Sequence, residues 1–64
     1  MFRQGKKDGK TDGAAHKSRE RYRGEPADKP GEKYHGGGLE KNNNERIAYD
    51  QGYGNGFEIV IIVI

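Results

Sequence analysis

The hydrophobic residues of this 64-residue chain are concentrated at its carboxyl end. The last eight residues, FEIVIIVI, include seven of them, whereas the first 46 residues include only eight, three of which are alanine. Six β-branched residues in a row favour a strand, and a strand that is apolar on both faces has to be buried on both sides. We therefore expect a strand over residues 57–64 that adds to the edge of a partner's sheet or pairs with a second copy of the chain.

An aromatic residue recurs at every fourth position just before and at the start of this run, at Tyr49, Tyr53 and Phe57. On a helix this spacing keeps the rings on one side, because it drifts by only about 40° per step from the 3.6-residue repeat. Each tyrosine is followed three residues later by a glycine, and the asparagines at 42–44 are good N-cap residues. The pattern predicts a short helix over about 45–56, with a turn at Asn55-Gly56 that leads into the strand as the alternative.

The first 23 residues combine glycines with basic side chains. Glycine stands at positions 5, 9 and 13, which on a helix form a stripe that lets another backbone come close. Each glycine also costs about 1 kcal/mol of helix stability relative to alanine, so we expect residues 2–13 to be flexible unless a partner holds them. Residues 14–23 contain neither glycine nor proline and are followed by Gly24 and Pro26, a pattern that predicts a second short helix.

The composition indicates a chain with too little apolar material for a core of its own. Only 30% of the residues are hydrophobic, 34% are charged and 11 are glycine, which is typical of segments that stay disordered alone. Because there is no cysteine, disulfide bonds and thiolate zinc sites are excluded. We expect a mostly disordered or irregular chain with three segments: a basic arm (1–23), a linker rich in proline, glycine and asparagine (24–44), and an aromatic-glycine segment with an apolar tail (45–64).

The charges are distributed unevenly between the two ends. Residues 1–23 carry eight basic and three acidic side chains (+5), whereas residues 24–64 carry four basic and seven acidic ones (−3), which together give +2. Arginines that alternate with an aromatic ring can contact both phosphates and bases of a nucleic acid, although a solvated mixed-charge surface is the alternative interpretation. The candidate nucleic-acid-binding residues are Arg3, Lys6, Lys7, Lys10, Lys17, Arg19, Arg21, Tyr22 and Arg23.

The sequence contains no recognisable catalytic or metal-binding pattern. His16 and His35 stand 19 positions apart on polar segments without cysteine, and Ser18 would point to a different helix face from His16. The ten carboxylates are spread along the chain without a pair in an apolar setting. We therefore expect a protein that is not an enzyme and that has no metal and no cofactor.

Two stretches, FRQGKKDGKTDG and ERIAYDQGYGNGFE, together resemble the ribosome modulation factor family of small bacterial proteins. The resemblance implies that a basic first helix and an aromatic-glycine second helix pack together and contact ribosomal RNA. It further implies that Tyr49 and Tyr53 form the interface between the helices. The tail FEIVIIVI has no counterpart in that pattern. The residues that would touch phosphates by this resemblance are Arg3, Lys6, Lys7 and Lys10.

These observations predict a small, cytoplasmic, non-catalytic binding protein. The basic arm would contact RNA or the ribosome, and the apolar tail would dock on a protein or on a second copy of the chain. The alternative is a self-assembling or membrane-associated peptide driven by residues 53–64, although the tail is far shorter than the ~20 residues that span a bilayer. The free carboxyl end could also be captured as a short linear motif. The candidate partner-binding residues are Tyr49, Tyr53, Phe57, Ile59, Val60, Ile61, Ile62, Val63 and Ile64.

Overall fold

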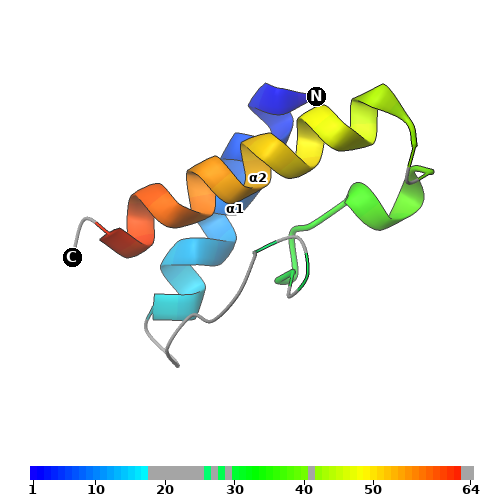
Figure 1. Ribbon diagram of the computed structural model, residues 1–64. Helices are drawn as coiled ribbons and strands as arrows, with labels where there is room; N and C mark the ends of the chain where they lie inside the picture. Colours follow the sequence, from blue (N-terminus) through cyan, green and yellow to red (C-terminus); the bar gives the residue numbers. More distant parts are fainter. Residues whose placement is uncertain (18–25, 27, 29, 41, 63–64) are drawn as a thin grey trace.

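The protein is built from two long helices that lie side by side (Figure 1). The computed structural model describes residues 1–17, 26, 28, 30–40 and 42–62. Helix α1 spans Phe2–Lys17 and helix α2 spans Asn44–Ile62, with one short 3-10 turn, η1, at Gly36–Gly38 between them. At the start of α2, the side-chain Oδ1 of Asn43 accepts a hydrogen bond of 2.7 Å from the backbone N–H of Glu45, an N-cap drawn from the expected run of asparagines.

The two helices touch backbone to backbone because glycines line both sides of the contact. A Cβ atom on Gly5 or Gly9 would lie only 2.1 Å from a carbonyl oxygen of α2, that of Tyr49 or Tyr53. In return, a Cβ atom on Gly52 or Gly56 would lie 2.0 or 2.1 Å from a carbonyl oxygen of α1. These contacts follow one another in the same order along α1 and along α2, so the two helices run in the same direction.

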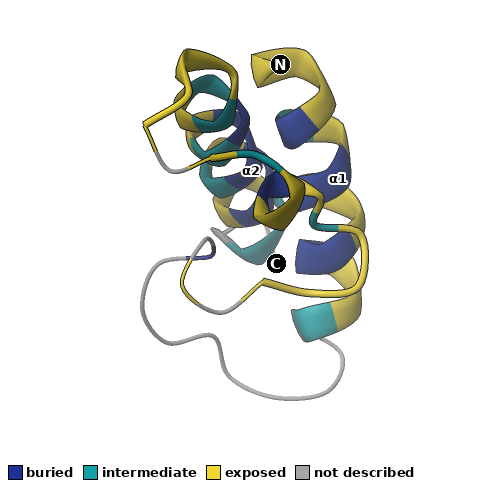
Figure 2. Cartoon of the chain, turned by 90° about the vertical axis from the view of Figure 1, so that its right-hand side faces the viewer, coloured by how far each residue is buried: buried dark blue, intermediate teal, exposed yellow. Residues whose placement is uncertain are grey.

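The core is aromatic and comes almost entirely from α2. Tyr49 and Tyr53 are 0% exposed and Phe57 is 2% exposed, and their rings lie one above the other at centroid distances of 6.3 and 5.9 Å. Tyr34, from the segment between the helices, meets both buried tyrosines edge-on at 5.5 and 5.0 Å. Figure 2 shows the buried stripes of the two helices facing each other, with exposed residues on the outer sides.

The predicted fold class is wrong in its main points. The Cα radius of gyration is 10.8 Å, close to the ~11 Å expected for a folded chain of this length and far below the ~24 Å of an unfolded one. The prediction of a mostly disordered chain counted the hydrophobic residues along the sequence. It missed that two glycine stripes allow close contact and that Tyr49, Tyr53 and Phe57 form a core, with Tyr34 packed against it. Residues 2–13, expected to be flexible, belong to α1.

The predicted strand over residues 57–64 is also wrong, because α2 continues to Ile62 and no strand occurs among the residues that the structure describes. Phe57 and Val60 lie on the face of α2 that packs against α1. A Cβ atom on Gly13 would lie 2.3 Å from Cγ2 of Val60. This tertiary contact outweighs the β-propensity of the run. The predictions of strand addition and β-augmentation through this run are therefore wrong.

Both helices expected from the sequence overlap with the observed helices in their residue ranges. The helix expected over 45–56 lies inside α2, which begins one residue earlier and continues for six residues more. Residues 14–17 of the helix expected over 14–23 form the end of α1, and its remaining residues lie outside the described part of the chain.

Candidate functional site

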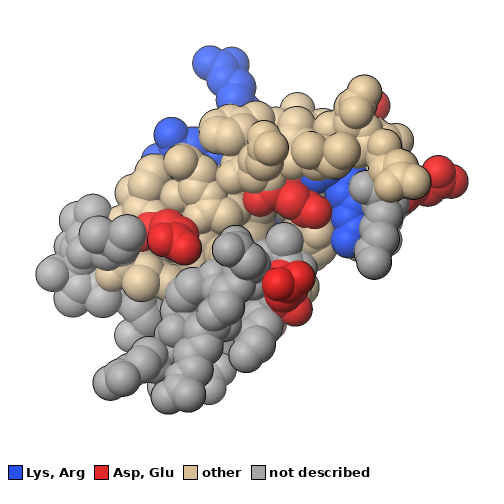
Figure 3. All heavy atoms as spheres, viewed as in Figure 1, with Lys and Arg blue, Asp and Glu red and all other residues tan. Residues whose placement is uncertain are grey.

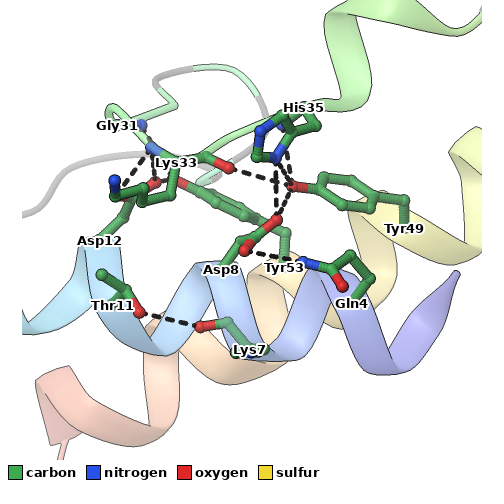
Figure 4. Close-up of polar contacts among 10 residues, drawn as sticks. All are labelled: Gln4, Lys7, Asp8, Thr11, Asp12, Gly31, Lys33, His35, Tyr49 and Tyr53. Atoms are coloured by element: carbon green, nitrogen blue, oxygen red, sulfur yellow. Dashed lines mark hydrogen bonds and ion pairs between the residues drawn. The ribbon is translucent and has the colours of Figure 1, made fainter.

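The main cluster of hydrogen-bonded polar side chains lies where the segment 31–35 crosses the helix pair (Figure 4). The hydroxyl of Tyr49 donates a hydrogen bond of 2.5 Å to Oδ2 of Asp8 and accepts one of 2.8 Å from the backbone N–H of His35. The same carboxylate accepts from Nε2 of Gln4 at 3.1 Å and lies 3.1 Å from Nδ1 of His35. Asp8 thus joins α1, α2 and the connecting segment at one point.

The arrangement is repeated one helical turn further along. The hydroxyl of Tyr53 donates to Oδ2 of Asp12 at 2.6 Å and accepts from the backbone N–H of Gly31 at 2.8 Å. Asp12 also accepts from the backbone N–H of Lys33, with its two oxygens at 3.1 and 3.0 Å. The two aspartates are four residues apart on α1 and the two tyrosines four apart on α2, so equal spacing on two parallel helices produces two equivalent pairs.

Burial and hydrogen bonding shift the pKa values of these groups in defined directions. Burial alone would raise the pKa of the Asp8 carboxyl, but hydrogen bonds from Tyr49, His35 and Gln4 outweigh it and hold that pKa below its ordinary value. Burial, together with the neighbouring aspartates, raises the pKa of the Tyr49 and Tyr53 hydroxyls well above 10.0. At neutral pH the Asp8–Tyr49 pair therefore consists of a carboxylate and a neutral phenol, which is the combination that its hydrogen bond requires.

A third tyrosine, Tyr34, and the nearby Arg46 also bind the connecting segment to α2. The hydroxyl of Tyr34 donates to Oδ1 of Asp50 at 2.5 Å, and Oδ2 of Asp50 lies 3.5 Å from Nε of Arg46. Nη1 of Arg46 donates to the carbonyl of Leu39 at 3.1 Å. Burial and the bond to Asp50 raise the pKa of Tyr34. The segment between the helices is thus attached to α2 by side chains along much of its described length.

The hydrogen bonds of this polar cluster join the two helices and the connecting segment. The hydroxyls of Tyr49 and Tyr53 each donate to a carboxylate and accept from a backbone N–H, and their raised pKa values leave no phenolate nucleophile at neutral pH. The side chain of His35 is 68% exposed, and its partners among the described residues are Asp8 and Tyr49. Within the described part of the chain, no group of three or more metal-ligating residues comes together.

The second candidate site is the outer face of α1. Arg3, Lys6, Lys7 and Lys10 occupy positions i, i+3, i+4 and i+7, which lie on one face of a helix. Together with Phe2 and Thr11 they line a shallow hollow. In the described part of the chain, none of the four has an ion-pair partner. Figure 3 shows lysine and arginine side chains protruding at the upper left edge of the molecule, where no acidic side chain is visible.

The structure divides the predicted site residues into two groups. Of the nine candidate nucleic-acid contacts it brings these four together on α1, hereafter the basic face. The side chain of Lys17 lies outside the described part of the structure, as do the remaining candidates Arg19, Arg21, Tyr22 and Arg23.

The predicted partner-binding residues also fall into two groups. Tyr49, Tyr53 and Phe57 are buried inside the chain's own core, so they are not available to another molecule in this fold. Ile59 is 37% exposed, whereas Val60 and Ile61 are partly buried. The side chain of Ile62 and residues 63–64 lie outside the described part. In that part, neither helix has the length and hydrophobicity that a membrane span requires.

Sequence reasoning missed the aspartates, which proved central to the polar cluster. Asp8 and Asp12 were counted as charges of a basic arm, yet both are buried. Their signal was present as a repeat: each stands directly before a glycine, four residues apart, as Tyr49 and Tyr53 are four apart. Comparison of the chain with protein-family models, with curated protein sequences and with solved structures finds no match, so its geometry is what carries an inference about function.

Proposed function

We propose that the protein is a small, non-catalytic RNA-binding module that contacts the phosphate backbone through the basic face of α1. The observation that carries the proposal is the placement of Arg3, Lys6, Lys7 and Lys10 on one helix face that includes no carboxylate. Such a face neutralises phosphates and releases the counterions condensed on a nucleic acid. The resemblance to the ribosome modulation factor family points to the same class of ligand.

Charge separation across α1 supports this proposal. The helix also carries Asp8 and Asp12, which would cancel half of the positive charge if they shared the surface with the lysines. Both are buried beneath the connecting segment, and each accepts a hydrogen bond from a tyrosine hydroxyl. The side of α1 that meets solvent is consequently more positive than the composition of the helix indicates.

The rigidity of the basic face supports it as well. The backbone of α1 is fixed against α2 at Gly5, Gly9 and Gly13, so the cationic side chains extend from a helix that is already ordered. A ligand then meets a preformed row of charges about 10 Å long, as the rise of a helix gives for seven residues. Binding to an ordered row avoids the cost of folding a flexible arm on the ligand.

The test is the salt dependence of RNA affinity for the full chain. Four phosphate contacts on a single strand give a slope of log K against log salt of about −3, so affinity falls about 50-fold between 50 and 200 mM salt. Lys7→Gln and Lys10→Gln each reduce the slope by about 0.7. Lys33→Gln is the matched control, because Lys33 is exposed and the hydrogen bonds described for it are made by its backbone N–H and carbonyl. A slope near zero, or an equal effect of Lys33→Gln, contradicts the proposal.

A further inference from the structure

The aromatic ring of Phe2 is placed differently from every other described aromatic side chain of the protein. Tyr49, Tyr53 and Phe57 are buried, and Tyr34 is partly buried against them. Phe2 is 41% exposed, and no described ring contacts it. It lies in the hollow that the cations of the basic face line. An exposed aromatic ring therefore lies within a patch of positive charge.

The backbone that carries this ring is held firmly. Phe2 is the first residue of α1, and a Cβ atom on Gly52 would lie 2.0 Å from its carbonyl oxygen, which places Phe2 at the crossing of the helices. The next residue of the basic face, Arg3, adjoins it, and Lys6 follows one turn later on α1. A ring on an ordered backbone presents its face at a small cost in conformational entropy.

We propose that Phe2 is a stacking platform for an unpaired base, and that the ligand of the basic face is therefore single-stranded RNA. A single strand can place its phosphates on the lysines and turn a base onto the ring, because every base has a π-face and no pairing partner has to be displaced. A duplex keeps its bases stacked inside the helix and offers only its backbone. This inference rests on the proposed function, since it names the kind of RNA that the same face takes.

Three ligands of equal length, of which only one offers unpaired bases, test whether Phe2 is a stacking platform. The probes are a short oligouridylate, an abasic strand of the same length, and a duplex of the same length. Phe2→Leu keeps an apolar side chain but removes the π-face. It is expected to lower the affinity for oligouridylate about 5- to 150-fold and to leave the affinity for the other two ligands unchanged. The salt slope stays the same, because no charge is removed.

A tryptophan reporter gives an independent reading, because the chain has no tryptophan of its own. Phe2→Trp keeps a stacking ring, so it is expected to bind oligouridylate at least as well as the natural chain. Its fluorescence is quenched by the single strand but not by the abasic strand. This readout also decides the question if Phe2→Leu disturbs the helix, which far-ultraviolet circular dichroism detects.

Three outcomes overturn the inference, and they differ in what they leave standing. If Phe2→Leu binds oligouridylate like the natural chain while Lys7→Gln still weakens binding, the platform is wrong and the RNA-binding proposal stands. If the natural chain binds no RNA even at low salt, both fail. If the fluorescence of Phe2→Trp responds to vesicles of anionic phospholipid and not to oligouridylate, the basic face and its ring belong to a membrane surface instead.

Discussion

The two sides of α1 use charged residues in opposite ways. On the side beneath the connecting segment, Asp8 and Asp12 are buried and accept hydrogen bonds from the hydroxyls of Tyr49 and Tyr53. On the outer side, Arg3, Lys6, Lys7 and Lys10 meet solvent without an ion-pair partner among the described residues. The inner charges form hydrogen bonds that stabilise the fold. The outer charges contribute little to stability, and by our proposal they bind the ligand. Stability and binding should therefore respond to different substitutions on one helix.

The largest expected effect comes from the glycine contact that creates the inner side. In Gly9→Ala the new Cβ atom would lie 2.1 Å from the carbonyl oxygen of Tyr53, so the helices have to separate. We expect a loss of about 3 kcal/mol or more in the free energy of unfolding. Urea unfolding followed by circular dichroism measures it.

Gly54→Ala is the matched control for that substitution. It also lies in a helix, but a Cβ atom there meets no atom within 4 Å. The substitution should stabilise the protein by about 0.5–1 kcal/mol, because alanine loses less backbone entropy than glycine on folding. Equal effects of the two substitutions would show that the backbone contact between the helices does not hold the fold together.

The next effect concerns the hydroxyls of the inner side. Tyr53→Phe keeps the ring but removes the bonds to Asp12 and to the N–H of Gly31, which leaves a buried carboxylate short of a donor. We expect a loss of about 1–3 kcal/mol in the free energy of unfolding. A double-mutant cycle with Asp12→Asn measures the coupling between the two residues. A coupling of zero contradicts the role assigned to the pair.

The pH dependence of stability reports the same inner groups. Because the pKa of Asp8 is lowered in the folded state, its contribution is present at neutral pH and is lost as the pH falls below about 4. The raised pKa values of Tyr34, Tyr49 and Tyr53 act at the other limit: stability decreases as the pH rises above about 10. Unfolding midpoints measured across the pH range show the loss of stability at both acid and alkaline pH. In Asp8→Asn stability should depend less on pH at the acid end. If the acid dependence is unchanged, Asp8 is not its origin.

The smallest expected effect on stability belongs to the outer side. Lys10→Gln should change the free energy of unfolding by less than about 0.5 kcal/mol, because Lys10 is exposed and has no ion pair among the described residues. Its effect on RNA affinity should nevertheless be measurable as a smaller salt slope. If Lys10→Gln destabilises the fold as much as Tyr53→Phe does, the division between an inner structural side and an outer binding side fails.

Part of this structure could be predicted from the spacing of aromatic residues and glycines along the sequence. The four-residue repeat of Tyr49, Tyr53 and Phe57 predicted a helix with its rings on one side, and that helix is α2. Gly5, Gly9 and Gly13 indicated a stripe that another backbone could approach, and α2 does approach it. The stripe was nevertheless expected to be flexible, because the cost of each glycine was counted without the contact that offsets it.

The remaining part depended on pairs of residues far apart in the chain. Asp8 and Tyr49, like Asp12 and Tyr53, are separated by 41 positions, and nothing local shows that they meet. The apolar run after Phe57 reads as a strand from its β-branched residues, yet it continues α2 because one face of that helix packs on Gly13. Local propensity amounts to about 1 kcal/mol at a position, which such contacts outweigh.

The sequence by itself determined the helical repeat of rings and glycines and the placement of the basic residues at i, i+3, i+4 and i+7, because both follow from the period of a helix. Only the tertiary structure decided which charges are buried. Asp8 and Asp12 are buried because the segment 31–35 crosses over them and forms hydrogen bonds with them, whereas the cations of the basic face line a shallow hollow. Burial is a property of what lies opposite a side chain, and that depends on the path of the whole chain.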